Sequence, residues 1–386
     1  MVWTVIRDGL LILALASFAY YLVAIVAALQ FFRGRDSALP EFTPPVSILK
    51  PIYGLDRETY QNYASFCLQD YPDYEILFCV SDQYDPAIPV IKEVARNFPE
   101  RAIKLIVGAE PLGVSDKVNK LCRMVREAQH QIVVLSDSDV RVEPEYLRAV
   151  IAPFRDPKVG AVTCLYRGLT DGSLAANLEA IGNSTDFTAG VLVAWLLGEV
   201  NFTLGATMAT TKTRLAEIGG FESLVDHFSD DYELGNRIAA RGHRVELSKF
   251  PVSIVYPRQT LADAFRHQLR WNISIRYSRP AGHLGLIFTQ GLALAVLAAI
   301  FAPSASWAVS LLLAYLVLRG VSAWVIGTWG MRDGGLRPRM ELLPVRDVFA
   351  FAVWVASFVP QRIHWRGQEF YVRDKRLVAA APREPS

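Results

Sequence analysis

Long apolar stretches with almost no charged residues lie near both ends of the chain. The first runs for 24 residues from Gly9 to Phe32, and a helix of about 20 apolar residues is enough to cross the roughly 30 Å hydrocarbon layer of a bilayer. A cleaved signal peptide would have a shorter apolar region of about 7 to 15 residues, followed by a small-residue cleavage site. We therefore predict a transmembrane anchor within residues 1–40.

A second apolar stretch covers Leu284–Ala302, and a short uncharged turn joins it to a third, Trp307–Trp329. This pattern predicts a transmembrane hairpin over residues 281–330. A fourth stretch, Val348–Pro360, has only 13 residues, which is typical of an interfacial or re-entrant helix rather than of a span. Arg319 interrupts the third stretch, and snorkelling of its guanidinium toward an interface is a sufficient explanation.

Basic residues follow the apolar stretches. Arg33 and Arg35 come after the first stretch, and Arg332 and Arg339 come after the third. Because cytoplasmic loops carry an excess of Lys and Arg, we expect an integral membrane protein with its central region in the cytoplasm. The basic tail within residues 331–386 is expected on the same side.

The central region, residues 41–280, alternates between short branched or aromatic runs and longer amphipathic ones. The short runs predict strands at Val46–Leu49, Glu75–Val80, Ile103–Val107, Ile132–Leu135 and Ala161–Leu165. The longer runs predict helices at Arg57–Asp70, Ala87–Asn97, Lys117–Ala128 and Pro144–Phe154. This alternation is typical of an α/β fold with a largely parallel, Rossmann-like sheet and helices on both faces.

Two further stretches, near residues 187–198 and 261–276, are expected to form helices at the membrane interface. The first is apolar but too short to span a bilayer, and the second is amphipathic. For residues 187–198 a buried core helix is an equal alternative.

Composition narrows the possible functions. Hydrophobic residues make up 52% of the 386 residues and charged residues only 20%, which excludes a wholly soluble protein. The net charge of +2 gives no support for nucleic-acid binding. The four cysteines form no CxxC pair, which fits a reducing compartment and argues against a structural zinc site.

Charged residues follow three of the predicted strands. Lys50 and Pro51 follow the first strand, Asp82 follows the second, and Asp137 and Asp139 follow the fourth. Ligands bind to such sheets outside the carboxyl ends of the strands. These residues are therefore candidates for a single site.

Asp137 and Asp139 form a DxD motif, and an extended chain directs both of their side chains the same way. Paired carboxylates suit Mg²⁺ or Mn²⁺, which bind carboxylates together with substrate phosphates. An isolated DxD more often only caps a helix. Here its place after a buried strand, together with Asp82, favours a metal or nucleotide site.

Two later motifs add candidates. Asp230 and Asp231 begin a helical pattern, in which one acid can cap the helix while the other acts as a general base. His267, Arg270 and Trp271 lie on the amphipathic stretch before the hairpin, where basic residues can contact lipid headgroups. Alternatively, Arg270 can hold a diphosphate, because a guanidinium matches phosphate oxygens in a fork.

The order of these motifs resembles the D, DxD, (E/T)D and QxxRW signature of inverting glycosyltransferases of GT-A fold. More narrowly, the chain resembles the ceramide glucosyltransferase family, grouped with glycosyltransferase families 21 and 2, and the related bacterial hopanoid-biosynthesis glycosyltransferases. The supporting segments are Lys50–Asp56, Leu77–Asp82, Asp85–Ala87, Gly113–Asn119 and His364–Gly367. The resemblance covers essentially the whole chain and implies a location in a bacterial inner membrane.

The resemblance implies transfer of glucose or N-acetylglucosamine from a UDP-sugar to the hydroxyl of a membrane lipid, giving a β-linked glycolipid. The lipid would be ceramide, with a hopanoid polyol as the alternative. The resemblance further implies that Lys50, Pro51 and Asp82 hold the uridine and that Lys117 lies beside the nucleotide.

The remaining roles are carried over in the same way. Asp137 would contact the ribose or diphosphate, and Asp139 would ligate Mg²⁺ or Mn²⁺. Asp231 would be the general base, and Arg270 with Trp271 would hold the diphosphate.

Two positions depart from the signature. Asp230 stands where the family has Glu or Thr, a tolerable change because the second acid is kept. His267 stands where the pattern has Gln or Arg, which leaves its role open.

Other functions remain as alternatives. A processive polysaccharide synthase would use the same acids but usually needs a longer membrane section. A non-catalytic membrane scaffold that binds nucleotide-sugars would not need the full acidic set. A transporter is disfavoured, because too few spans are predicted to enclose a path.

Overall fold

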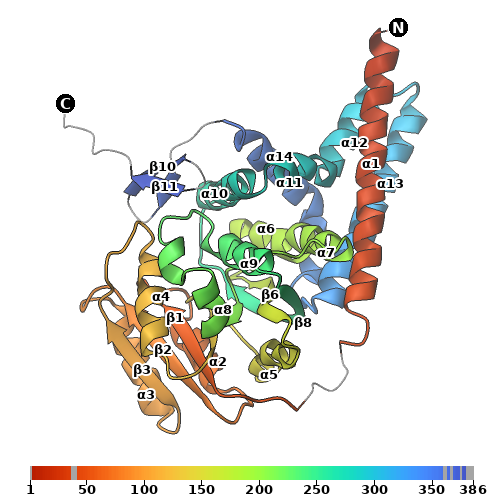
Figure 1. The fold of residues 1–386 in the computed structure, drawn as a ribbon. Coiled ribbons are helices and arrows are strands. Elements are labelled where there is room, and N and C mark those ends of the chain that lie inside the picture. The colour runs from red at the N-terminus through yellow and green to blue at the C-terminus, as the bar shows by residue number, and fades with distance from the viewer. Residues whose placement is uncertain (1, 36–40, 360–362, 366–367, 374–375, 380–386) are drawn as a thin grey trace, which may run out of the picture. The chain divides into compact units, whose positions relative to one another are not determined.

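The computed structural model describes residues 2–35, 41–359, 363–365, 368–373 and 376–379. Two compact units alternate along the sequence (Figure 1). The sheet unit comprises residues 34–166, 200–257 and 361–386, and the helical unit comprises residues 1–33, 167–199 and 258–360. The sequence analysis expects consecutive segments instead, so the interruption of the sheet unit by residues 167–199 is a new feature.

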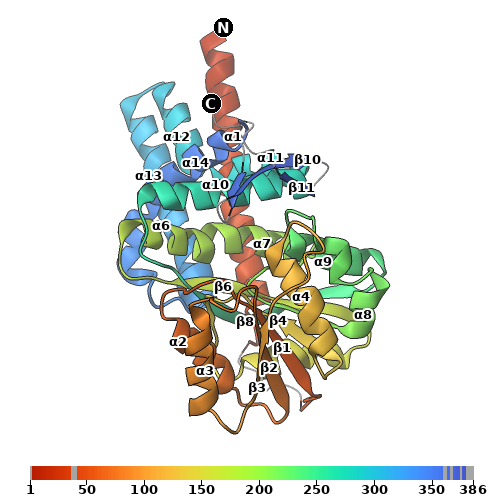
Figure 2. The same cartoon turned by 90° about the vertical axis from the view of Figure 1, so that its left-hand side faces the viewer.

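An eight-stranded sheet with strand order β3-β2-β1-β4-β7-β6-β8-β5 forms the centre of the sheet unit (Figure 2). Four neighbouring strands are parallel: β3 (Ala102–Val107), β2 (Tyr74–Val80), β1 (Val46–Pro51) and β4 (Ile132–Leu135). Leu49 of β1 is in register with Leu77 of β2 and Leu135 of β4. The predicted parallel arrangement is therefore confirmed for these strands, and their carboxyl ends lie at one edge.

The other half of the sheet is antiparallel. Its strands are β7 (Met208–Thr211), β6 (Val159–Leu169), β8 (Arg244–Val255) and β5 (Val140–Arg141). β7 pairs antiparallel with both β4 and β6, and β5 pairs antiparallel with β8. The sequence analysis predicts only part of β6 and misses the other three. β7 and β5 are very short, and Pro251 interrupts the pattern of β8 in a way that argues against a strand.

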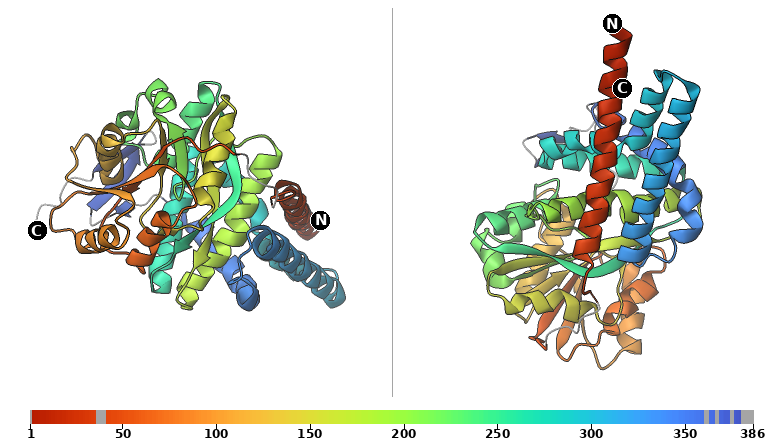
Figure 3. Two further views of the ribbon diagram at one scale, coloured as in Figure 1. Left: turned by 90° about the horizontal axis from the view of Figure 1, so that it is seen from below. Right: turned by 90° about the vertical axis from the view of Figure 1, so that its right-hand side faces the viewer.

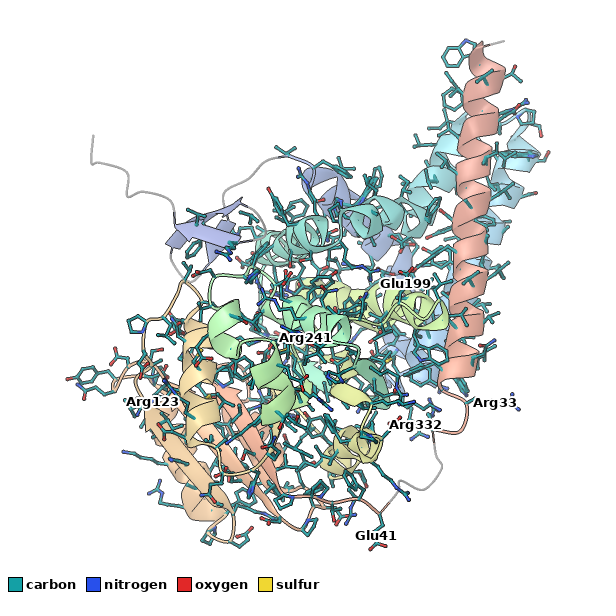
Figure 4. All side chains as sticks on the ribbon, viewed as in Figure 1. Arg33, Glu41, Arg123, Glu199, Arg241 and Arg332 are labelled. Carbon is teal, nitrogen blue, oxygen red and sulfur yellow. The ribbon has the colours of Figure 1, made fainter. Side chains whose placement is uncertain are left out.

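Helices cover both faces of this sheet, as predicted. They are α2 (Thr59–Cys67), α3 (Ala87–Asn97), α4 (Asp116–Glu127), α5 (Tyr146–Ile151) with the 3-10 turn η1 (Ala152–Arg155), α8 (Lys212–Glu217), η3 (Phe221–Leu224) and α9 (Asp230–Ala240). α4, α8 and α9 share a hydrophobic core with Leu49 and Leu77 of the strands. α2 packs on the opposite face, where the rings of Tyr63 and Phe78 lie 4.9 Å apart. Arg241, labelled in Figure 4, marks the C-terminal end of α9.

The helical unit consists mainly of packed helices. They are α1 (Val2–Phe31), α6 (Leu174–Gly182), the π-helical η2 (Asn183–Phe187), α7 (Thr188–Leu196), α10 (Leu261–Ser278), α11 (Pro280–Gly285), η4 (Leu286–Thr289), α12 (Gly291–Ile300), α13 (Ala305–Ala323), the π-helical η5 (Trp324–Gly330), η6 (Arg337–Leu342) and α14 (Leu343–Ala356). α6, η2 and α7 form one continuous helical stretch, and α7 packs against α1. Val191 and Leu192 of α7 are buried, whereas Leu197 just after the helix is 65% exposed, so the first half of the predicted helix near residues 187–198 packs in the core of this unit and its place at a membrane interface stays a prediction.

Among the residues that the structure describes, two helices are long and apolar enough to cross a membrane, Trp3–Phe31 and Ala305–Gly330. The helices at 280–289 and 291–300 bend by 57° at their junction, and they add a third candidate if the pair is one span. α1, α12 and α13 pack side by side (Figure 3, right). α14 has 14 residues, which is shorter than a span needs.

Arg319 does not snorkel, contrary to the sequence analysis. Its side chain is only 2% exposed and lies inside the helical unit. The guanidinium is 2.6 Å from Asp186 of η2 and 3.0 Å from Asp347 of α14, and it donates a hydrogen bond to Thr185 Oγ1 at 3.2 Å. The correction has a simple physical cause, because the carboxylates of buried Asp347 and half-buried Asp186 compensate the buried cation, and the guanidinium does not have to reach water.

The C-terminal segment contains a three-stranded antiparallel sheet of β9 (Ile363–Trp365), β10 (Gln368–Arg373) and β11 (Arg376–Ala379). An isolated bridge joins Arg376 to His227 of the sheet unit. The segment His364–Gly367 lies partly outside the described residues. The four cysteines are free and buried.

Candidate active site

The end of β1 lies beneath the DxD motif. Lys50 is fully buried, and its ammonium donates hydrogen bonds to the main-chain oxygen of Asp137 at 2.8 Å and to Ser136 Oγ at 3.5 Å. Burial lowers the pKa of Lys50 to about 7, although the charges of Asp137, Asp139 and Asp56 act in the opposite direction. Lys50 thus fixes the turn that carries the two aspartates of the motif.

Lys117, in the first turn of α4, connects acids from two other elements. Its ammonium is 2.8 Å from Asp137 Oδ1 and 3.5 Å from Asp230 Oδ2. Burial alone would lower the pKa of Lys117, but Asp137, Asp230 and Asp231 outweigh burial and raise it. The structure therefore brings the DxD motif and the acids at the start of α9 together around one cation.

Asp231 lies in the first turn of α9. The N-cap residue is Ser229, whose side chain makes no capping hydrogen bond. Asp231 Oδ2 instead accepts a hydrogen bond from the main-chain N–H of Gly205 at 3.1 Å, and its Oδ1 accepts one from that of Tyr232 at 2.8 Å. The carboxylate is therefore held against the loop before β7.

Gly205 leaves open the space that Asp137 and Asp231 share. A Cβ atom at Gly205 would lie 3.3 Å from Asp137 Oδ2, 3.4 Å from Asp231 Oδ2 and 3.9 Å from Lys117 Nζ. Burial and the neighbouring Asp230 raise the pKa of Asp231 to about 6, with Lys117 acting in the opposite direction. A carboxylate with a pKa near neutrality is suited to accept a proton as a general base.

Asp139 has the properties of a ligand for a hard cation. Burial raises its pKa to about 7, with Asp137 and Asp56 adding to the effect and Lys50 opposing it. Within the described residues, no three His, Cys, Asp or Glu side chains are placed to hold a metal by themselves. Mg²⁺ and ions like it need only one or two carboxylates when phosphates supply further oxygens, so the residues present fit a divalent ion shared with a bound phosphate group.

Asp82 and Pro51 lie at the same edge of the sheet. Pro51 is buried as the last residue of β1, and Asp82 is exposed just beyond β2. Asp82 Oδ1 accepts a hydrogen bond from the main-chain N–H of Tyr84 at 2.9 Å. Asp85 then fixes the loop after β1, because its Oδ2 accepts a hydrogen bond from the N–H of Gly54 at 3.0 Å.

The remaining predicted residues belong to α10 of the helical unit. His267, Arg270 and Trp271 are each half-buried, and the rings of His267 and Trp271 lie 4.7 Å apart. His267 Nδ1 is 2.8 Å from Glu179 Oε1 of α6. These three residues form a group of their own, and their predicted role toward a diphosphate stays a prediction.

Sequence analysis missed three contributors to the acidic site. Asp56 lies close enough to affect the pKa of both Lys50 and Asp139, and the sequence pointed to it only as the last residue of the segment Lys50–Asp56 that supports the family resemblance. Burial, and then the charges of Asp231, Asp137 and Asp139, raise the pKa of Tyr166 well above its ordinary value. Gly205, the third, lies in a loop that gives no pattern in the sequence.

A sheet of this mixed topology with a DxD motif at the end of a central parallel strand is the GT-A fold of glycosyltransferases. A solved mannosyltransferase, PcManGT from Pyrobaculum calidifontis in complex with GDP-Man and Mn²⁺, shares it with a TM-score of 0.55 and 18% sequence identity, over 92% of this chain and 99% of that chain. The predicted fold class is thereby confirmed.

Sequence comparison identifies the family, and the chain belongs to glycosyl transferase family 21, whose sequence model matches residues 9–378. Ceramide glucosyltransferase 1 of Caenorhabditis elegans is 30% identical over 271 residues, which cover 68% of this chain and only 58% of that protein. Ceramide glucosyltransferase 3 of the same organism is 23% identical, over 92% of this chain and 79% of that protein. These findings confirm the predicted family, whereas the relation to hopanoid enzymes stays a prediction.

Proposed function

We propose that this protein is a membrane-bound ceramide glucosyltransferase, which transfers glucose from UDP-glucose to the hydroxyl of ceramide and inverts the anomeric configuration. Membership of family 21 and the two ceramide glucosyltransferase relatives support this proposal. The observation that carries the mechanism is the group of Asp137, Lys117 and Asp231 around the open space at Gly205.

The donor nucleotide is assigned to the carboxyl edge of the parallel strands. Asp82 and the end of β1 at Pro51 bind the uridine, and Lys117 with Asp137 positions the ribose and diphosphate. Lys50 acts from below by holding the main chain of Asp137. Asp139 is the metal ligand, and the solved mannosyltransferase of the same fold was in complex with Mn²⁺. A bound Mg²⁺ or Mn²⁺ would supply positive charge against the leaving diphosphate.

Asp231 is the general base. A single carboxylate on the face opposite the leaving group is enough for inverting transfer, since it only has to take the proton of the attacking hydroxyl. The bonds from Gly205 and Tyr232 orient its carboxylate. Arg270 and Trp271 of α10 hold the departing diphosphate, because a guanidinium pairs with phosphate oxygens in a fork.

The acceptor comes from the bilayer. Trp3–Phe31 and Ala305–Gly330 are long and apolar enough to anchor the chain in a membrane. Arg33 and Arg35 after the first of these helices favour a cytoplasmic sheet unit, because Lys and Arg are enriched on the cytoplasmic side of a membrane. The acceptor hydroxyl thus belongs to a lipid that is already in the same membrane.

The test is a transfer assay with the purified full-length protein in lipid. UDP-glucose and UDP-N-acetylglucosamine labelled in the sugar are offered in turn with ceramide or a hopanoid polyol, with Mn²⁺ or Mg²⁺ present. We expect labelled β-glucosylceramide, with its anomeric configuration determined by NMR. Transfer of N-acetylglucosamine to the hopanoid would replace the proposed donor and acceptor. Formation of a labelled polymer would reject the proposal, and so would the absence of metal-dependent UDP release.

A variant of the base sharpens this test. Asp231→Asn is expected to lower the turnover number by about two to four orders of magnitude, the usual contribution of a general base, while UDP still binds. Glu246→Gln, on β8 with its carboxylate bonded to Arg244, serves as the matched control and should leave turnover unchanged. Near-normal turnover of Asp231→Asn would remove Asp231 from the mechanism.

A further inference from the structure

Within the sheet unit, the loop before α4 contacts the loop that leads to α9. We call this contact the α4–α9 junction, and it consists of residues 113–115 and residues 225–226. The proposed mechanism uses Lys117 and Asp231, which lie in the first turns of α4 and α9, but it gives the junction no role. The segment Gly113–Asn119 supports the family resemblance, and the mechanism uses only Lys117 from it.

Two main-chain donors of the first loop bind the second loop. Val114 N–H donates a hydrogen bond to Asp226 Oδ1 at 3.1 Å, and Ser115 N–H donates one to the main-chain oxygen of Val225 at 2.8 Å. Ser115 is buried and is also the N-cap of α4, where its side chain accepts a hydrogen bond from the N–H of Val118. The residue that begins α4 is therefore bonded directly to the loop before α9.

Gly113 allows the two loops to approach each other closely. A Cβ atom at Gly113 would lie 2.5 Å from Val225 Cγ2 and 2.6 Å from Asp226 Oδ1, so only glycine fits there without a shift of the neighbouring loop. The N–H of Gly113 donates to Asn119 Oδ1 at 3.1 Å, and its main-chain oxygen accepts a hydrogen bond from Asn119 Nδ2 at 2.9 Å. The first loop is thus fixed by its own helix as well as by the opposite loop.

Arg237 attaches the second loop to the body of α9. Its guanidinium donates hydrogen bonds to the main-chain oxygen of Ser223 at 3.2 Å and to Ser223 Oγ at 2.9 Å. It also lies 2.8 Å from His227 Nε2. Because these contacts lie on both sides of Val225 and Asp226 in the sequence, a displacement of the junction would be transmitted to α9.

The start of α9 is held between the α4–α9 junction and another loop. On one side, Thr203 Oγ1 donates a hydrogen bond to the main-chain oxygen of Asp231 at 2.7 Å. On the other side, Lys117 Nζ is 3.5 Å from Asp230 Oδ2 but only 2.8 Å from Asp137 Oδ1. The ion pair between the two helices is the longer and weaker one, so we assign their spacing to the bonds of the junction.

We propose that Asp226 is a positioning residue that sets the place of the base Asp231 relative to the nucleotide-binding residue Lys117. Asp226 acts through the main-chain N–H of Val114 and does not need to contact a substrate. The inference rests on the proposed function, which gives Lys117 and Asp231 their roles. A general base has to lie within hydrogen-bond reach of the proton that it removes, so the position of α9 affects the rate directly.

The inference predicts that catalysis and nucleotide binding respond differently when the junction is loosened. Lys117 keeps its ion pair with Asp137 of the DxD motif, so the nucleotide site is retained. Asp231, in contrast, moves with the start of α9. The loss is therefore expected in the turnover number and not in the affinity for UDP.

The experiment compares Asp226→Ala with the wild type, both as full-length protein in lipid. Initial rates give kcat and the KM for UDP-glucose, and calorimetry gives the dissociation constant of UDP. We expect kcat to fall by about tenfold to a hundredfold, because small displacements of reacting groups have effects of that size. The KM for UDP-glucose and the dissociation constant of UDP should stay close to the wild-type values.

Two further variants separate positioning from a merely structural role. Asp226→Asn keeps a side-chain oxygen that can accept the hydrogen bond of Val114, so it should restore most of kcat. Gly113→Ala pushes the two loops apart without removing the carboxylate, and it should reproduce the loss of kcat. If Asp226→Ala does not fold, Gly113→Ala provides the same test.

Asp156→Ala is the matched control. Asp156 Oδ1 also accepts a hydrogen bond from a main-chain N–H, that of Lys158 at 2.9 Å. Asp156 lies just before β6, whose first residues are at the edge of the sheet where β4 begins, opposite the site. We expect this variant to have the kcat of the wild type.

Two outcomes would overturn the inference. One is an unchanged kcat in Asp226→Ala or in Gly113→Ala. The other is a loss of kcat in Asp226→Ala that Asp226→Asn does not restore, or that is matched by an equal loss of UDP binding. If the wild-type protein itself transfers no sugar, the proposed function fails instead, so the two failures are distinguishable.

Discussion

At the scale of single residues, the absence of a side chain matters as much as the acids do. A Cβ at Gly205 would enter the space between Asp137 and Asp231. We predict that Gly205→Ala lowers kcat/KM by about tenfold to a hundredfold, because small displacements of reacting groups have effects of that size. Gly285→Ala is the control, since no atom lies within 4 Å of a Cβ there. A fully active Gly205→Ala enzyme would show that this space is not part of the site.

The pKa of Asp231 gives stability and activity opposite dependences on pH. Its folded-state pKa of about 6 lies above the unfolded value of about 3.9, so its contribution to stability is fully present below the unfolded value and is lost as the pH rises through about 6. A general base needs the ionised form, so activity should fall as the pH falls through the same value.

We therefore predict that Asp231→Asn has a higher thermal unfolding midpoint than the wild type at pH 8. The difference should shrink toward pH 4, where the wild-type carboxyl is protonated. Thermal scans without substrate in one detergent would measure both midpoints. A lower midpoint for Asp231→Asn at pH 8 would contradict the raised pKa of the Asp231 carboxyl.

How well a site residue could be predicted depended on how its partners are arranged along the sequence. Asp137, Asp139 and Asp231 each stand at the end of a strand or the start of a helix, where local patterns locate them. Glu179 and Arg319 could not be interpreted in that way. Their surroundings come from helices far away in the sequence, and no local sequence pattern indicates which charged residue will lie next to each of them.

At the scale of elements, the buried ion pairs of the helical unit join helices from separate parts of the chain. Arg319 of α13 contacts Asp186 of η2 and Asp347 of α14, and Arg346 lies over Gly182 and pairs with Asp186. Removing one partner of a buried pair costs about 3 to 5 kcal/mol, because a charge is left uncompensated.

We predict that Arg319→Met lowers the thermal unfolding midpoint markedly in detergent. Arg319→Met combined with Asp347→Asn should recover part of the loss, since one unpaired charge is removed. Thermal scans of the three proteins at equal detergent concentration would measure this. An unchanged midpoint for Arg319→Met would instead favour the snorkelling arrangement, in which water solvates the guanidinium.

At the scale of elements, some strands of the sheet could be predicted from the sequence pattern and others could not. β1, β2 and β4 are buried runs of branched residues, so their composition alone predicted them. β7 is too short to establish alternation, and β8 contains a proline, so both depend on pairing with strands that were formed elsewhere in the chain. Contacts with the rest of the fold determine whether such segments form strands.

At the scale of the whole molecule, the two units share one interleaved chain. Residues 167–199 leave the sheet unit and form α6 and α7 of the helical unit, where Val191 and Leu192 are buried and α7 packs against α1. A protein shortened to residues 41–280 would lose α1 and expose these apolar positions.

We predict that this shortened protein aggregates or associates with membranes when it is made without detergent. Size-exclusion chromatography with and without detergent would test this, with the full-length protein in detergent as the reference. A monodisperse monomer in plain buffer would show that α6 and α7 do not need the rest of the helical unit.

The position of β7 in the sheet has a consequence for synthesis on the ribosome. β6 is joined to β4 only through β7, yet β7 is translated after β6 and after the whole of α6 and α7. The nascent chain must therefore carry β6 for a time without either neighbour, and exposed strand edges of this kind promote misassembly. Because α1 is translated first, early docking of α7 on α1 would restrict the positions that β7 can sample before it pairs with β4 and β6.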